Sequence, residues 1–239
     1  MFIIIGNFGN PTIALLQWAI EQKLNPTYVV SVATGWASEE WQKRVQEAEN
    51  YAKNNGFSIE RLQAQPAFSE LVHERKHFPS QKFQWCATFL KGLPINDWLD
   101  KIDPRCQTTI LLGKRRLDTR AYADLPEFLE ASEHFGQRKV WHPLVNCSDQ
   151  EFIDLIRRSG FSLLTHRSLE CDPCIHSRGN DLNRLSSTSI IKTKNLEKEL
   201  NITMFTKDIE TMVTDAKLNE TSLKDMFTMG CGSPFGCGE

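Results

Sequence analysis

The sequence predicts an α/β protein built on a doubly wound, mostly parallel sheet. Short apolar runs alternate along the first half of the chain with longer segments whose apolar residues recur at helical spacing. This alternation is typical of βαβ units, in which parallel strands form the sheet and the helices between them cover its two faces. A length of 239 residues suits one sizeable core with appended segments better than two full domains.

The individual elements follow from apolar patterning and from helix-start signals. The predicted strands are residues 2–5, 28–32, 57–62 and 108–112. The predicted helices are residues 12–21, 38–54, 68–75, 88–99 and 148–158. Asn10 is a suitable cap for a helix that starts at Pro11, Ser38 can cap the second helix, and Ser148 with Glu151 has the spacing of a capping box.

The strand pattern fades beyond about residue 160. Residues 161–239 contain four of the seven cysteines and predict helices and loops instead of strands. We therefore expect a nucleotide-binding α/β domain at residues 1–160 and a cysteine-rich C-terminal subdomain with a mobile tail at residues 161–239. The polar stretch 186–194 is the best candidate for a mobile internal segment.

Charge and hydropathy restrict the classes of partner. A net charge of −2 provides no general attraction for nucleic acid or anionic membranes. No apolar stretch approaches the roughly 20 residues that cross a bilayer, and the opening MFIII lacks the basic residues of a secretory signal. We expect a cytoplasmic protein without membrane contact. Thiols stay reduced there, so close cysteine pairs indicate metal binding or redox chemistry.

Two segments at the predicted carboxyl edge of the sheet could bind phosphate. The turn GNFGN at residues 6–10 connects a strand to a helix, so that backbone N–H groups and the helix N-terminus converge. The stretch GKRRLDTR at residues 113–120 follows the fourth strand, and its arginines could clamp phosphates. The alternatives are a tight structural turn and a solvated basic loop.

Six motifs in order resemble the PAPS reductase family of the PP-loop ATP-pyrophosphatase superfamily, over roughly residues 3–185. They are Phe8-Gly9 in the turn, ATGW at residues 33–36, WCxxxLKxxPxxxWL around Cys86, GKRxxDTR at 113–120, WHPL with SDQEF at 141–152, and CxxC at 171–174. With the glycine-flanked cysteines of the tail, they look most like the ATP-pyrophosphatase component of bacterial DNA phosphorothioation systems.

The resemblance implies ATP with Mg²⁺ in a cleft at the strand ends. It places the phosphates at the first turn and the basic stretch, and the rest of the nucleotide beside the second strand. The residues concerned are Gly6, Asn7, Phe8, Gly9, Asn10, Thr12, Thr34, Gly35, Arg115 and Arg120. ATP-cleaving members usually carry SGGxDS where this chain has GNFGNPT, so the mode of Mg²⁺ binding stays open.

The cysteines divide into a predicted ligand set and a predicted reactive tail. The CxxC spacing of Cys171 and Cys174 suits zinc, an iron–sulfur cluster or a redox dithiol. The resemblance adds Cys86 as the third ligand of a [4Fe–4S] cluster, with zinc as the alternative metal. The expected fourth ligand is Cys231, with Cys237 or an open iron site as alternatives. The resemblance also implies that Cys237 is the reactive thiol, acting with Arg115. Cys106 and Cys147 are expected to be core residues.

Three functions remain open from the sequence. The first is an ATP pyrophosphatase that adenylates an acceptor for sulfur insertion, with DNA backbone phosphate as acceptor, a cysteine desulfurase as sulfur donor, and a DNA-binding or DNA-nicking protein that brings the DNA. The second is an assimilatory PAPS or APS reductase in which Cys237 attacks the sulfate sulfur. The third is a degenerate PP-loop scaffold that binds nucleotide or metal without turnover.

Overall fold

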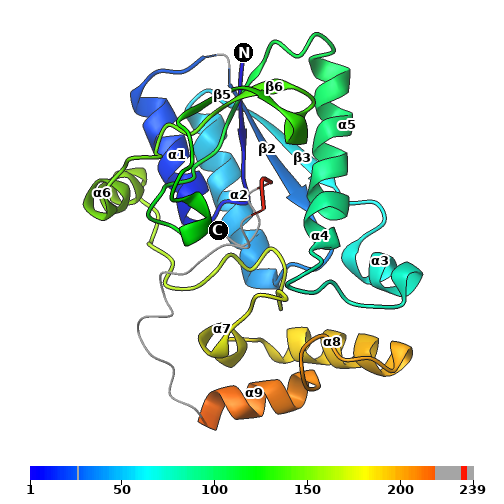
Figure 1. The fold of residues 1–239 in the computed structure, drawn as a ribbon. Helices are drawn as coiled ribbons and strands as arrows, with labels where there is room; N and C mark the ends of the chain where they lie inside the picture. The colour runs from blue at the N-terminus through cyan, green and yellow to red at the C-terminus, as the bar shows by residue number, and fades with distance from the viewer. Residues whose placement is uncertain (26, 219–232, 236–239) are drawn as a thin grey trace.

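The computed structural model describes residues 1–25, 27–218 and 233–235, and its strands form one α/β sheet. In these ranges six strands pair in the order β3-β2-β1-β4-β6-β5. They are β1 (Phe2–Ile5), β2 (Thr27–Ala33), β3 (Ser58–Gln63), β4 (Thr109–Leu111), β5 (Phe128–Ser132) and β6 (Arg138–Trp141). All neighbours pair in parallel except β5 and β6, so the predicted fold class is confirmed (Figure 1).

Helices cover both faces of this sheet. They are α1 (Asn10–Glu21), α2 (Glu39–Asn54), α3 (Phe68–Arg75), α4 (Trp85–Ala87), the π-helical η1 (Thr88–Gly92), α5 (Leu93–Ile102), the 3₁₀ turns η2 (Arg120–Tyr122) and η3 (Glu133–Phe135), α6 (Asp149–Ser159), α7 (Gly179–Asn183), α8 (Ser187–Leu200) and α9 (Ile209–Leu218). Ile4 packs in the core shared with α1, α2 and α6, whereas Ile3 and Ile5 pack in the core shared with η1 and α5. Successive side chains of β1 therefore point to opposite faces and bury both layers.

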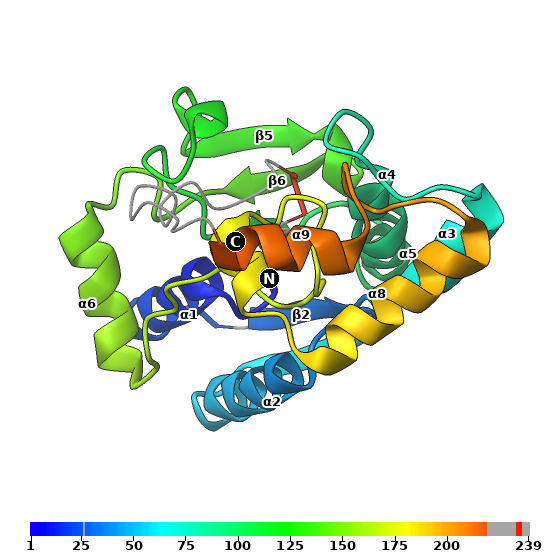
Figure 2. The same cartoon turned by 90° about the horizontal axis from the view of Figure 1, so that it is seen from below.

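The last three helices lie beyond the carboxyl ends of the strands. Figure 2, which views the molecule from that side, shows α8 and α9 crossing in front of the sheet. The helices have a small apolar cluster of their own, formed by Leu182, Ile209, Val213 and Ala216. The predicted boundary at residue 160 stays a prediction. In the described ranges no helix combines the length and apolar character needed to cross a bilayer.

Several local expectations need correction. The stretch 186–194, expected to be mobile, forms the first half of α8, with the Ser186 hydroxyl accepting a bond from the Ser189 N–H. Gly9, not Asn10, is the N-cap of α1. The expected helix 88–99 begins as the π-helical η1 before α5. Sequence patterning does not reveal strands β5 and β6, because β5 (FLEAS) is mostly exposed and mixed in composition and β6 (RKVW) begins with two basic residues, so that neither contains an apolar run.

A fully buried arginine joins β6 to the end of α5. The Arg138 guanidinium donates to the Asp103 carboxylate at 3.0 Å and to the carbonyl oxygens of Leu99 and Asp103. Asp103 also accepts bonds from the N–H groups of Gln107 and Thr108, which precede β4. This arginine therefore fixes the end of α5 against two neighbouring strands.

We expect Arg138→Met to lower the free energy of unfolding by about 3–5 kcal/mol, because it leaves the buried Asp103 charge without its guanidinium. The matched control is Lys139→Met. Lys139 lies next along the strand, and its ion pair with Glu130 is largely exposed, so its loss costs at most about 1 kcal/mol. Urea unfolding of both variants measures the difference, and equal losses would contradict this reading of Arg138.

Candidate functional site

The turn after β1 is closed by its own side chains. The Asn7 N–H donates to the Thr12 hydroxyl at 3.2 Å, and the Gly9 N–H donates to the Asn7 side-chain oxygen at 2.8 Å. A Cβ at Gly6 would lie 2.1 Å from the Thr12 hydroxyl oxygen, so only glycine fits there. Phe8 adopts a positive φ of 65° and is fully buried. Two of the N–H groups that sequence analysis assigned to phosphate, those of Asn7 and Gly9, thus have partners inside the turn, and phosphate binding here stays a prediction.

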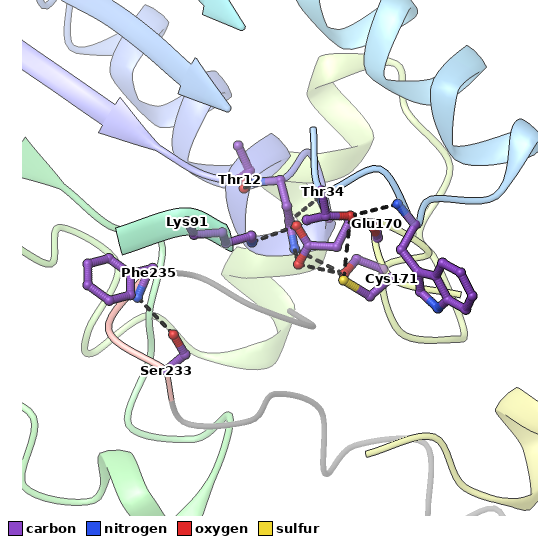
Figure 3. Close-up of polar contacts among 11 residues, drawn as sticks. Thr12, Thr34, Lys91, Glu170, Cys171, Ser233 and Phe235 are labelled. Carbon is purple, nitrogen blue, oxygen red and sulfur yellow. Dashed lines mark hydrogen bonds and ion pairs between the residues drawn. The ribbon is translucent and has the colours of Figure 1, made fainter. Parts of the chain in front are cut away.

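A buried carboxylate connects this turn to three other segments. Glu170 accepts a bond from the Asn7 amide at 2.9 Å and forms a 2.5 Å ion pair with the Lys91 ammonium. Ser168 accepts a second bond from the Asn7 amide, and the Thr34 hydroxyl donates to the Glu170 carbonyl oxygen at 2.6 Å. We call these five residues the Glu170 junction; Figure 3 shows Glu170 between Lys91 and Thr34. Lys91 and Glu170 are both at least nine-tenths buried.

Two cavities meet at the Glu170 junction. The β2 cavity, of about 310 Å³, lies beside the carboxyl end of β2. Its lining includes Asn7, Thr34, Gly35, Trp41, Arg61 and Glu170. The cysteine cavity is small, about 40 Å³, and its lining includes Thr34, Cys86, Lys91, Glu170, Cys171 and Cys174. Thr34 and Glu170 belong to both walls. The volume of the β2 cavity lies at the lower end of the range of small-molecule sites.

The structure brings together three of the four predicted metal ligands. Cys86 from α4 and the CxxC pair Cys171 and Cys174 line one cavity, although they are distant in sequence. The Cys171 thiol donates to the Thr34 hydroxyl at 3.6 Å. Burial raises the pKa of Cys171 well above its usual value, and the charges of Glu170, Cys174 and Cys86 raise it further. These thiols are therefore close enough to influence one another electrostatically.

The described residues do not form a metal centre. Within residues 1–25, 27–218 and 233–235, no group of three or more His, Cys, Asp or Glu side chains could hold a metal ion. The arrangement of Cys86, Cys171 and Cys174 therefore does not support the predicted [4Fe–4S] cluster or its zinc alternative. The predicted fourth ligand Cys231 and the predicted reactive Cys237 lie outside the described residues.

The predicted phosphate-clamp arginines lie apart from the two cavities. The Arg115 guanidinium pairs with Asp118 at 2.8 Å and Asp149 at 2.9 Å, and it stacks 4.0 Å from the centre of the Phe152 ring. Arg120 is exposed in η2. Neither is among the residues that line the β2 cavity or the cysteine cavity. Their roles in phosphate binding and catalysis stay predictions, and Arg115 has carboxylate partners within the fold.

Sequence reasoning missed the charged pair at the centre of the site. Lys91 was noticed only as part of the motif around Cys86, and Glu170 was not singled out. The available signal was an acidic residue directly before the CxxC pair. Cys106 and Cys147, expected in the core, are only half-buried.

Comparisons with known proteins identify no family for the chain. No family model matches the sequence. A protein of Escherichia phage 186, described as an uncharacterized 37.8 kDa protein in the gpa 5′ region, is 26% identical over 122 residues. The match covers 48% of this chain and about a third of that relative, 36% of its length. Among solved structures, NMN synthetase from Francisella tularensis is similar with a TM-score of 0.47 and 13% identity, over 95% of this chain and 81% of that one.

We expect Lys91→Met to lower the free energy of unfolding by about 3 kcal/mol, because it leaves the buried Glu170 charge without the Lys91 ammonium. The double variant Lys91→Met with Glu170→Gln removes both charges and should recover at least half of this loss. Chemical denaturation of the wild type, both single variants and the double variant gives the coupling energy. Strictly additive losses would show that the ion pair contributes nothing to the junction.

A buried histidine near the basic stretch at residues 113–120 makes the free energy of unfolding depend on pH. The His142 Nδ1–H donates to the Pro126 carbonyl oxygen at 2.8 Å, and burial, with a smaller effect of Lys114, lowers the pKa of His142 to about 4. The unfolded chain takes up this proton near pH 6.5 and the folded protein only near 4. The free energy of unfolding therefore falls by up to about 3 kcal/mol as the pH drops through this window.

His142→Asn retains a side-chain N–H that can reach Pro126 but removes the titration. We expect the variant to lose less stability than the wild type between pH 6.5 and 4 in urea unfolding at stepped pH. The matched control is His77→Asn at an exposed position. In this variant the free energy of unfolding should change with pH as it does in the wild type. Parallel pH profiles of wild type and His142→Asn would refute this assignment.

Proposed function

We propose that the protein is an adenine-nucleotide-dependent enzyme of the PP-loop type that cleaves ATP to AMP and pyrophosphate and activates an acceptor for sulfur insertion. The observation that carries the proposal is the shared wall of the two cavities. Thr34 and Glu170 border both the β2 cavity, at the strand ends where open α/β sheets bind ligands, and the cysteine cavity with its three thiols. An activated acceptor in the β2 cavity would lie next to the thiols of the cysteine cavity.

The proposed reaction has three displacement steps. An acceptor oxygen attacks the α-phosphorus of ATP and displaces pyrophosphate, so that the acceptor becomes adenylated. The terminal sulfur of a cysteine persulfide then attacks the acceptor atom and displaces AMP with the original oxygen. A second thiol cleaves the resulting S–S bond, which leaves sulfur on the acceptor and joins the two thiols in a disulfide that an external dithiol reduces. The β2 cavity would hold the adenosine between Gly35 and Trp41, and the Asn7 turn would approach the phosphates. Mg²⁺ would accompany the ATP.

For the acceptor we propose an oxygen of the DNA backbone, which would make the reaction a phosphorothioation. The motifs of residues 3–185, taken together with the glycine-flanked cysteines of the tail, resemble the ATP-pyrophosphatase component of DNA phosphorothioation systems, and this resemblance supports the finer assignment. A cysteine desulfurase would supply the sulfur, and a DNA-binding or DNA-nicking partner would bring the DNA. The net charge of −2 agrees with access to DNA through a partner, because tight direct binding depends on many phosphate contacts by Lys and Arg.

Reduction of PAPS or APS is the second candidate. It is favoured by the position of the described part of the tail, since the buried Phe235 docks next to the helix that carries Lys91. Release of sulfite from PAPS or APS in the presence of thioredoxin would support the reductase. Nucleotide binding without turnover of ATP, PAPS or APS would instead support the scaffold.

The primary test is formation of AMP and pyrophosphate from ATP by the protein with its partner and DNA. We expect Ala37→Leu, which narrows the β2 cavity, to weaken ATP binding at least tenfold in calorimetry. Ala123→Leu, at an exposed position, is the control for the added side chain and should bind like wild type. Intact ATP after incubation with partner and DNA would refute ATP cleavage, and equal affinity in both variants would refute the β2 cavity as the nucleotide site.

A further inference from the structure

One deeply buried arginine lacks the partners that other buried basic side chains have. Lys91, Arg115 and Arg138 are buried as well, and each of them pairs with a carboxylate. Arg167 is only 6% exposed, and its Nη1 donates to the His176 carbonyl oxygen at 3.3 Å. Within the described ranges no carboxylate lies at ion-pair distance from its guanidinium. The positive charge of Arg167 is therefore buried without a counter-charge from these residues.

The two remaining nitrogens of Arg167 form an unused edge of the guanidinium. Nε and Nη2 are both shielded from solvent, and neither has a hydrogen-bond partner in the part of the chain that the structure describes. These two nitrogens lie side by side in the guanidinium plane, so their N–H bonds run parallel and match two oxygens of one carboxylate or phosphate. A buried charge left in this way is costly. The edge thus has the chemistry of an oxyanion site.

The segment that carries Arg167 is bonded to the turn after β1. The Asn10 amide donates to the Leu164 carbonyl oxygen at 2.8 Å, and the Leu164 N–H donates to the Asn10 side-chain oxygen at 2.9 Å. Ser168, next to Arg167, accepts a bond from the Asn7 amide at 3.0 Å. Asn10 is the first residue of α1, and the N-terminus of a helix favours anions. The segment therefore brings a full positive charge to this neighbourhood.

The same arginine adjoins the cysteine cavity. Ser168 and His176, whose carbonyl oxygen Arg167 contacts, both line that cavity. His176 is half-buried, and its Nε2 has no hydrogen-bond partner among the described residues. The His176 ring can therefore move without losing a hydrogen bond at this atom.

We propose that the Nε–Nη2 edge of Arg167 binds two oxygens of one phosphate group, between the turn after β1 and the cysteine cavity. Because both nitrogens are shielded from solvent, we expect the phosphate to enter as the His176 ring moves aside. We name phosphate and not carboxylate because a helix that follows a strand and a tight turn binds phosphate at its N-terminus.

This site differs from the phosphate clamps that the sequence suggests. Arg167 lies outside all six sequence motifs, whereas Arg115, the predicted clamp, is already paired with two aspartates. The phosphate could come from a nucleotide or from the DNA backbone, and both present the same pair of oxygens. That this phosphate belongs to ATP or to the DNA acceptor rests on the proposed function, whereas binding at Arg167 does not.

Three variants separate the paired N–H edge from positive charge alone. Arg167→Met removes the guanidinium and keeps an apolar side chain, and Arg167→Lys keeps the charge without the parallel N–H pair. Arg105→Met, at an exposed position, is the matched control for the loss of one positive charge. In phosphate-free buffer Arg167→Met should melt at or above the wild-type temperature, because it removes an uncompensated buried charge.

Calorimetric titration of the full chain with pyrophosphate measures the binding. We expect wild type and Arg105→Met to bind pyrophosphate equally, and both Arg167 variants to bind it at least about tenfold more weakly, because charge-assisted hydrogen bonds are lost. A second titration uses the dinucleotide TpT, whose one phosphate is a diester. A loss of affinity in the Arg167 variants for TpT instead of pyrophosphate would assign the site to the DNA backbone.

Two results would overturn the site. One is a wild type that binds neither probe, and the other is equal affinity for both probes in all four proteins, which would leave Arg167 a purely structural residue. The titrations need no turnover, so binding at Arg167 can be established even if ATP stays intact. Formation of AMP at the wild-type rate by an Arg167→Met protein with unchanged pyrophosphate and TpT affinity would refute this site and leave the proposed function standing.

Discussion

The site depends on how the fold accommodates one buried carboxylate. An ionised side chain inside a protein is costly unless a charge and hydrogen bonds compensate it. Glu170 is compensated by the Lys91 ammonium and the Asn7 amide, while its carbonyl oxygen accepts a bond from Thr34. These partners come from η1, the turn after β1 and the end of β2. Satisfying one charge therefore fixes the relative positions of the segments that line both cavities.

The basic stretch after β4 shows why a run of charges is a poor guide to a ligand. GKRR suggested phosphate clamps because arginines at strand ends can bind phosphate bidentately. In the fold, Lys114 holds the tail, Arg115 pairs with two aspartates, and Arg116 donates to the Leu125 carbonyl oxygen. The stretch organises the loops at this edge of the sheet, and any phosphate that binds near Arg115 competes with carboxylates of the chain itself.

Elements whose formation depends on local patterning could be predicted from the sequence. The first three strands, the cap at Ser38 and the capping box at Ser148 are local features, and the structure contains them. The pairing of Lys91 with Glu170 depends on the packing of distant segments, so no spacing rule reveals it. Residues 186–194 were mispredicted for the same reason. Their polar composition does not indicate a helix, because contacts with a distant segment stabilise it. Lys192 donates to the Trp36 carbonyl oxygen and lies over the Trp36 ring.

The cysteine motifs were a better guide to proximity than to ligation. Cys86, Cys171 and Cys174 come together as the motif order implied, yet the described residues around them do not form a metal-binding group. Their environment is largely apolar, and burial favours the thiol over the thiolate at Cys171.

A buried thiol of this kind becomes a good nucleophile or ligand only when a nearby positive charge or hydrogen-bond donor stabilises the thiolate. The Lys91 ammonium lines the same cavity but is paired with Glu170. Glu170 also accepts a hydrogen bond from the Asn7 amide. A ligand that draws this amide away removes one of the groups that stabilise the Glu170 carboxylate, and so alters the electrostatic environment of the thiols. By linkage, a change in thiol ionisation affects the affinity for that ligand equally. If the β2 cavity binds nucleotide as proposed, the Glu170 junction connects that nucleotide physically to the thiols of the cysteine cavity.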